Sequence, residues 1–356
     1  MSAVDLVVTS RPTIRIAGRD DTGVTQGLVY MRIEDHTDGL AHCELQVGNW
    51  GLKGSETGFL YFDRRTLDFG KQLQVDVGRR TLFDGRITGL EAGFPESAPP
   101  VLTVLAEDRL QDLRLTRRTR TFVDMTDAAI FSQLATDHGL TPNIDADGPS
   151  HPVVTQVSES DLAFLRRRAG LLGVELWATG STLHVAPRGS RATGTPLTLG
   201  YARELREFTV LADLADQRSS VTVRGWDVSA KQEIAETADD GDLGSEAAGG
   251  DNGAAVLKAA LAEHKEIVAS DLPLTAAEAS KVAKARLLEF ARRFVSGRGV
   301  ADIAPGIAVG TKVKIGGVGP LFEGEYYVTE TTHVFDAAFG LRTEFSVERP
   351  WLGRPT

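Results

Sequence analysis

The chain has little cysteine and no long apolar run. Cys43 is the only cysteine among 356 residues, so no disulfide can form within the chain. In the alternating segment HCELQV it is predicted to be a small core residue and not a nucleophile. No stretch approaches the about 20 apolar residues of a membrane helix, and MSAVDLVVTSRP lacks the features of a signal peptide. We therefore expect a protein made in the cytoplasm, without membrane insertion.

Excess positive charge is also missing. The chain has 49 acidic and 39 basic side chains, a formal net charge of −10. Nucleic-acid binding is therefore not expected, because phosphate contacts need a basic surface. Arginine clusters in two places, where we predict contacts with an acidic partner or a neighbouring subunit, since guanidinium pairs bidentately with carboxylates. These residues are Arg114, Arg117, Arg118 and Arg120, and Arg166, Arg167 and Arg168.

Signatures of catalysis and metal binding are not found. The seven histidines include no HExxH, and His36 and His42 are predicted to lie in a loop between strands. The segment from Asn143 resembles a calcium loop, but Val154 stands where that loop needs a bidentate glutamate. There is no G-x-S-x-G or P-loop, and the glycine pairs at 316–319 precede no helix. We expect no catalytic residue, metal or cofactor.

The sequence contains an internal repeat. LFDGRITGLE at 82–91 is similar to LFEGEYYVTE at 321–330. Each is preceded by an alternating segment (QLQVDV or TKVKIG) and followed by another (VLTVLAED or LRTEFSVE), which predicts the same β-meander twice. The predicted common turn is a Phe–acid–Gly corner, with Phe83 and Gly85 in the first copy and Phe322 and Gly324 in the second.

The similarity extends upstream to two strands that contain tryptophan. CELQVGNWG is predicted to end a strand at Trp50, and SVTVRGWDV to end one at Trp226. Trp50 precedes Gly70 by 20 positions and Trp226 precedes Gly310 by 84, which predicts a 64-residue insertion in the second copy. Residues 232–256 are acidic and rich in glycine, typical of a mobile loop, and the segments after them have helical periodicity.

A different unit lies between the copies. MTDAAIFSQLATDHGL and SESDLAFLRRRAGLLG predict two capped helices, and VELW with TLHVAP predicts a hairpin. The expected fold class is α+β, mainly β. The expected domains are a tube-like β-barrel at 1–112, a small α/β module at 113–190, a second tube-like barrel at 191–231 and 296–356, and an acidic loop with helices inserted at 232–295.

Four segments in this order resemble a known family: LDFGKQLQVDVG with LFDGRITGLEA and LTVLAEDRLQDLRLTRRTRTF, then VSESDLAFLRRRAGLLGVELW, VTVRGWDVSAKQEI, and VGTKVKIGGVGPLFEGEYYVTETTHVF. They are similar to the phage late control gene D proteins, the tail hubs of contractile phages and extracellular contractile injection systems. The same segments resemble the N-terminal hub half of VgrG spike proteins.

The resemblance implies a structural, non-enzymatic role. Such hubs are homotrimers with two tube-like barrels per chain, and the pseudo-hexameric ring adapts a six-fold tail tube to a three-fold spike. The implied partners are further copies of the chain, the tail tube protein, other baseplate components and a separate spike protein, since the sequence ends at VERPWLGRPT. The implied location is a phage tail or injection particle assembled in bacteria. A tail module that binds or degrades peptidoglycan remains the alternative.

Overall fold

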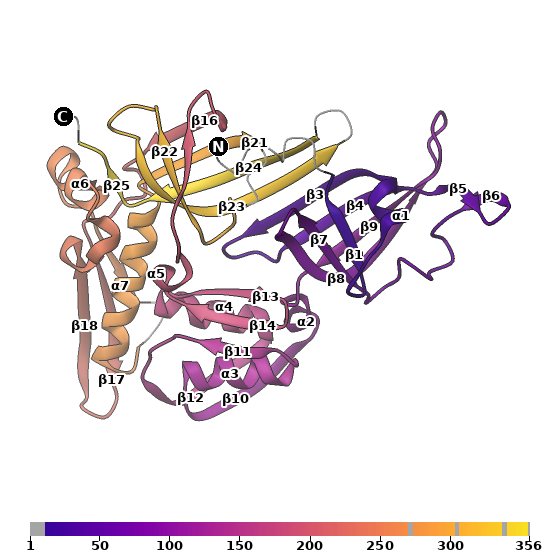
Figure 1. The fold of residues 1–356 in the computed structure, drawn as a ribbon. Helices are drawn as coiled ribbons and strands as arrows, with labels where there is room; N and C mark the ends of the chain where they lie inside the picture. The colour runs from indigo at the N-terminus through magenta and orange to yellow at the C-terminus, as the bar shows by residue number, and fades with distance from the viewer. Residues whose placement is uncertain (1–10, 270–272, 303–305, 337–339, 355–356) are drawn as a thin grey trace.

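The chain folds around one large antiparallel sheet. The structure is a computed structural model that describes residues 11–269, 273–302, 306–336 and 340–354. Strand makes up 49% and helix 21%, which confirms the mainly-β α+β class. Figure 1 shows the sheet running across the molecule, with the α/β module below it and the helix-containing insertion at one end.

The large sheet has 13 strands and unites both copies of the repeat. Its spatial order is β16 (Leu205–Ala212), β21 (Val295–Asp302), β24 (Gly340–Arg349), β23 (Gly324–Asp336), β3 (Leu28–His36), β4 (His42–Gly48), β9 (Val101–Glu107), β8 (Arg80–Gly93), β7 (Gln72–Val77), β1 (Thr13–Ile16) and β2 (Arg19–Asp20). Two more strands, β22 (Lys312–Gly316) and β15 (Leu197–Gly200), extend it beside β23.

Within the described residues no closed barrel is formed, although two were predicted. The strands of the first copy and those of the second are instead joined side by side through β3 and β23. Each copy has a hydrophobic core of its own beneath its part of the sheet. The short helix α1 (Thr22–Gly27) and the hairpin of β5 (Trp50–Lys53) and β6 (Glu56–Phe59) belong to the first copy.

The α/β module contains the predicted helices and hairpin. Its helices are α2 (Gln111–Arg114), α3 (Asp127–Asp137), α4 (Asp161–Leu172) and α5 (Arg188–Arg191); its strands are β10 (Arg117–Thr126), β11 (Thr141–Ile144), β12 (Ser150–Ser160), β13 (Glu175–Thr179) and β14 (Thr182–Ala186). The side chains of Thr126 and Ser160 cap α3 and α4 by accepting backbone N–H groups. Gly173 ends α4 with a left-handed φ of 67°.

The segment between β16 and β21 is more ordered than predicted. It comprises β17 (Ser220–Asp227), β18 (Gln232–Asp239), the 3₁₀ segment η1 (Asp240–Ala247), β19 (Asp251–Asn252), α6 (Gly253–Leu261), β20 (Lys265–Val268) and α7 (Ala276–Arg292). The predicted mobile loop at 232–256 is therefore wrong over most of its length. Trp351 in β25 (Trp351–Leu352) packs so closely on Gly249 that a side chain there would clash, which fixes η1 and β19 against the C-terminal segment.

The strands that contain Trp50 and Trp226 were predicted to be equivalent in the two copies of the repeat, and this prediction is wrong. The strand that contains Trp226 is β17, which lies outside the large sheet and pairs with β18 and β20. In the second copy the place of β4 is taken by β21, since β4 is bonded to β9 and β21 to the equivalent β24. The long insertion therefore falls between β16 and β21, and the domain limits 191–231 and 232–295 remain a prediction.

The repeat itself is visible in matching irregularities. The pairing of β8 with β9 shifts register between Ile87 and Gly89, and that of β23 with β24 shifts between Val328 and Glu330. The skipped residue is a threonine in both, and each hydroxyl donates across the bulge, to Leu105 O (3.4 Å) and Ser346 O (3.3 Å). A second pair of shifts, at Val29 between β3 and β4 and at Arg206 between β16 and β21, matches in the same way. Bulges are specific features of a strand pair, so this agreement identifies equivalent strands.

The bulges also show that the LF-D/E-G motifs are two residues out of register. The structural counterpart of Ile87 is Val328. Phe83 is therefore equivalent to Gly324, and Gly85 is equivalent to Tyr326. The ring of Phe83 occupies the space above Gly85, where a Cβ would lie 2.5 Å from Cζ. An aromatic residue and a glycine have therefore exchanged places between the copies. In addition, Phe322 lies in a turn before β23 whereas Phe83 lies inside β8, so the predicted common corner is wrong.

This difference leads to unequal effects of two matched substitutions. Phe83 is 3% exposed in the first core, and Phe322 is only partly buried at the edge of the second. We expect Phe83→Asp to lower the free energy of unfolding by about 4 kcal/mol, because a cavity and a buried carboxylate are created together. Phe322→Asp should cost about half as much, measured by urea denaturation. Equal losses would contradict the two-residue offset.

Candidate assembly surfaces

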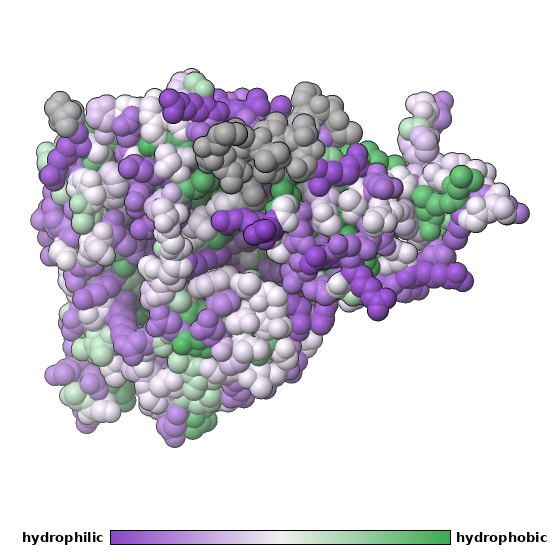
Figure 2. Space-filling view, in the orientation of Figure 1, coloured by the Kyte–Doolittle hydropathy of each residue, from purple (hydrophilic) through white to green (hydrophobic). Residues whose placement is uncertain are grey.

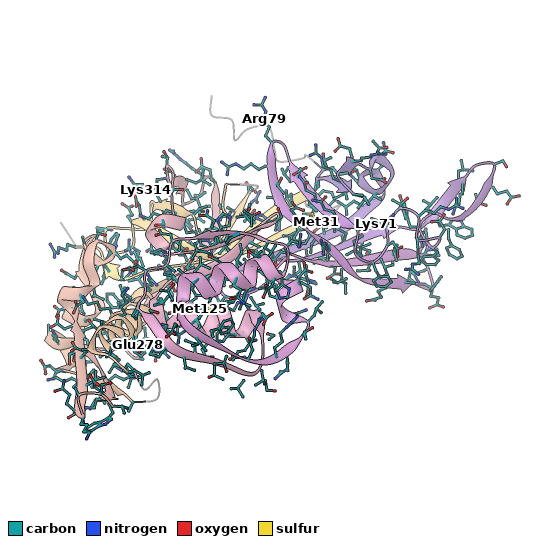
Figure 3. The ribbon with its side chains drawn as sticks, turned by 90° about the horizontal axis from the view of Figure 1, so that it is seen from below. Met31, Lys71, Arg79, Met125, Glu278 and Lys314 are labelled. Carbon is teal, nitrogen blue, oxygen red and sulfur yellow. The ribbon has the colours of Figure 1, made fainter. Side chains whose placement is uncertain are left out.

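The junction between β3 and β23 is the internal interface of the chain. Seven consecutive residue pairs join the strands, from Glu330 with His36 to Asp336 with Tyr30. Three β23 side chains on one face are almost completely buried there, namely Thr331 (2% exposed), His333 (4%) and Phe335 (5%). Phe335 packs in the core of the first copy although it belongs to the second. Met31, labelled in Figure 3, lies opposite it on β3.

The junction contains a histidine that the fold keeps neutral. Burial lowers the pKa of His333 to about 4. Its Nδ1 atom is 2.9 Å from the hydroxyl of Thr343, which is also buried. The sequence analysis did not mark His333, because a single histidine in an alternating strand gives no signal of its own.

Among the strand edges that have no partner within the described part of the chain, two belong to β16 and β8. One is the outer edge of β16, which forms the end of the sheet. The other is on β8, where β7 pairs only as far as Arg86 and leaves the same side of Thr88–Gly93 open. Unpaired edges expose backbone N–H and C=O groups and are ready to accept another strand.

Exposed aromatic residues gather beside the open part of β8. Phe94 follows β8 and lies 6.2 Å from Phe59 and 6.0 Å from Phe62, between ring centroids. Trp50 contacts Phe59 edge to face, and all four side chains are exposed. Figure 2 shows hydrophobic side chains on the projecting β5–β6 region, where these strands lie. An exposed apolar cluster of this kind indicates a contact surface.

Most of the predicted contact arginines are bonded within the α/β module. Arg168 is 7% exposed and donates through Nε and Nη2 to both carboxylate oxygens of Asp127, at 2.6 and 2.9 Å. His151 bonds the same carboxylate at 2.9 Å. Asp127 is the first residue of α3 and has no exposed surface, so this cluster is part of the module's interior.

The start of α4 has a similar arrangement. Asp161 is bonded by Arg120, His138 and Gln156, and Arg118 lies 3.5 Å away. Burial by itself would raise the pKa of Asp161, but these hydrogen bonds and charges outweigh it and lower the pKa. The other arginines bond Glu107 (Arg114), Ser158 O (Arg117), Gly39 O (Arg166) and Glu159 (Arg167). Arg114, Arg118 and Arg167 are about half exposed and keep surface for a partner.

A buried ionic cluster attaches the module to the second copy. Glu175 accepts from Arg188 (2.8 Å), from Arg191 (2.9 Å) and from the hydroxyl of Tyr327 on β23. Arg188 also bonds Glu348 on β24. Burial alone would raise the pKa of Glu175, but the two arginines lower it overall. The sequence analysis missed these residues, because partners that are more than 150 positions apart leave no local pattern.

Neither a metal site nor a membrane-spanning helix is found in the described part of the chain. Among the described residues, no three histidine, cysteine, aspartate or glutamate side chains are placed to hold a metal ion. No described helix is both long and apolar enough to cross a membrane.

Whole-chain comparison places the fold among tail proteins. A 43 kDa tail protein of prophage MuSo2 from Shewanella oneidensis is 16% identical, with a TM-score of 0.69 over 96% of this chain and 98% of that one. The tail protein from Neisseria meningitidis MC58 is 13% identical, with a TM-score of 0.68 over 96% and 97%. The E. coli c3393 protein, a type VI secretion component with structural similarity to T4 tail proteins gp27 and gp5, is 13% identical, with a TM-score of 0.61 over 96% and 79%.

The chain therefore has a fold shared with phage tail proteins and a type VI secretion component. Comparison with proteins of curated function gives no match. Residues 12–336 match the profile of the family described as the Alg8 N-terminal domain. The chain belongs to the Alg8 N-terminal domain family.

Acid should weaken the junction through His333. The unfolded side chain titrates near 6.5, and the folded one at about 4, so only the unfolded state takes up a proton between these values. Stability should fall as the pH drops from about 6.5 to about 4, by roughly 3 kcal/mol from this residue. The difference in free energy of unfolding between wild type and His333→Gln, measured by urea denaturation at pH 7 and pH 4, should shrink accordingly. A difference independent of pH would disprove this role.

Arg168 and Arg167 are neighbours on α4, but the first is buried and the second is half exposed, so their effects on stability can be compared. Arg168→Met leaves the buried carboxylate of Asp127 without its charge partner, so we expect a loss of about 3 to 5 kcal/mol. Arg167→Met removes a half-exposed pair with Glu159 and should cost less than about 1 kcal/mol. Thermal denaturation of the purified variants measures both. Similar melting temperatures would show that the Asp127 cluster is not needed for folding.

Proposed function

We propose that this protein is a structural hub of a contractile tail or injection particle, in which three copies join the tail tube to the spike. The observation that supports the proposal most directly is the repeat: two equivalent strand sets stand side by side in one sheet, and each set has an open edge, on part of β8 in one and on β16 in the other. Three such chains present six similar units, which matches a three-fold assembly to a six-fold tube. The likeness to tail proteins over 96% of the chain agrees with this role.

The face of the sheet that points away from the cores is suited to lining a channel. Alternation along the strands places polar side chains on this face in both copies. Several of them border one shallow groove across the second copy and the junction, namely Arg32, Glu207, Thr209, Arg298, Glu330, Thr332 and Glu344. A polar, mixed-charge wall allows water and cargo to pass without strong attachment.

The proposed role is mechanical and not catalytic. The partners are further copies of the chain, the tail tube protein, a separate spike protein and other baseplate components. The half-exposed arginines Arg114, Arg118 and Arg167 are proposed contacts with these partners. The same proposal includes membership of the phage late control gene D family. It also includes the division into two barrel domains, each of which would be completed by its neighbours in the ring.

Particles purified through an affinity tag on this chain test the assignment. We expect electron microscopy to show a ring of three copies around an open axis, between the tube and the spike. Mass spectrometry of the released hub should give three times the mass of the 38.3 kDa chain. A single copy per particle, or a position away from the tube axis, would contradict the proposal.

A further inference from the structure

The observed junction within the chain predicts a second junction between chains. We infer that the C-terminal half of β8 in one chain docks on the outer edge of β16 in a neighbouring chain. The register is the one in which β23 docks on β3 within a chain. The inference rests on the proposed ring, and adds to it the two strands, their register and the side chains that are buried.

The strand equivalence follows from the matched bulges. Val328 corresponds to Ile87 across the β23 and β8 bulges, so the part of β23 that binds β3 corresponds to the open part of β8. Arg206 corresponds to Val29 across the β16 and β3 bulges, so the open edge of β16 corresponds to the edge of β3 that receives β23. Each chain therefore contains both edges of such a junction, the open part of β8 and the outer edge of β16, and neither has a partner among the described residues.

The two edges also match in the chemistry of their side chains. In the junction within the chain, Met31 and Ile33 of β3 face Phe335 and His333, and all are buried. Phe208, Val210 and Ala212 occupy the same positions on β16 and already pack partly on the second core. The inferred register places three apolar pairs on this face: Leu90 opposite Ala212, Ala92 opposite Val210 and Phe94 opposite Phe208.

Phe94 carries the strongest single indication. It is 64% exposed, whereas its counterpart Phe335 is 5% exposed because β3 and the first core cover it. A large aromatic side chain at the end of an open strand gains most from such a cover, since burial of apolar area is the main favourable term in association. When Phe94 docks on the core of the second repeat in a neighbouring chain, it gains the buried environment that Phe335 already has.

Cysteine trapping tests the register. The variant Ala92→Cys/Val210→Cys places one thiol on each edge, at the positions equivalent to His333 and Ile33. The native Cys43 is fully buried, and burial raises its pKa, so it does not compete. Each chain has one cysteine on its β8 edge and one on its β16 edge, so it can be linked to two neighbouring chains. Mild oxidation of the purified full chain should therefore give covalent dimers and trimers, and nothing larger than the closed ring of three.

The controls use the same positions. The single variants Ala92→Cys and Val210→Cys should stay monomeric on oxidation, because each junction needs one cysteine of each kind. The pair Ala92→Cys/Thr209→Cys should also stay monomeric, because neighbouring residues of a strand point to opposite faces. Equal cross-linking of this pair, or none by Ala92→Cys/Val210→Cys, would overturn the inference.

Phe94 is tested in the cross-linking background. Phe94→Asp should reduce trapping about tenfold or more, as for an aromatic side chain that becomes buried in a contact, without changing the melting temperature of the monomer. Phe69→Asp, at an aromatic side chain that is 53% exposed elsewhere in the first copy, should change neither. Unchanged trapping by Phe94→Asp would remove Phe94 from the contact.

The outcomes separate this inference from the proposed function. A trimeric hub in particles without trapping by the cysteine pair would leave the hub role in place and refute the docking. Trapped trimers of the pure chain, with particles that contain no such ring, would leave the docking in place and refute the hub role.

Discussion

The need to pair strand edges governs this structure. A β-sheet has backbone donors and acceptors along both borders, and a partner strand or water must satisfy them. The chain meets this need once internally, where β23 pairs with β22 over its first residues and with β3 from Glu330 to Asp336. That one pairing makes two strand sets into a single sheet and buries Phe335 of one set in the core of the other. The edges that remain open are the ones on which the proposed docking between chains depends.

Buried charge fixes the α/β module relative to the sheet. Glu175 lies between Arg188, Arg191 and Tyr327, and it is held by hydrogen bonds that compensate for its loss of hydration. Such a cluster tolerates little displacement, because each group left without its partner would be a charge in a dry interior. The module is therefore held in a constant orientation relative to the second copy.

Local patterns predicted the secondary structure well and the repeat in outline. Alternation predicted β7, β8, β9, β22, β23 and β24. The capping patterns placed the start of α3 at Thr126 or Asp127, where Thr126 is the cap, and that of α4 at Ser158, two residues before the observed cap Ser160. Letter identity then misled the alignment by two positions, because Phe83 and Gly85 exchange roles with Gly324 and Tyr326. In the second core, Gly297 and Gly299 stand where Cys43 and Leu45 stand in the first, and the rings of Phe208 and Phe345 fill the space. This compensation hid β21, and the β17 strand with Trp226 was chosen in its place.

The sequence by itself determined the class of the protein: a mainly β chain with two meanders, an α/β module between them, one buried cysteine and no local signature of catalysis. These features depend on periodicity and composition over short segments, which the sequence displays directly. Only the tertiary structure decided which strands are equivalent, how the copies are joined, which arginines are buried and which edges stay open. Those properties depend on contacts between residues far apart in the chain, where volume and charge are balanced across an interface and no single segment records the balance.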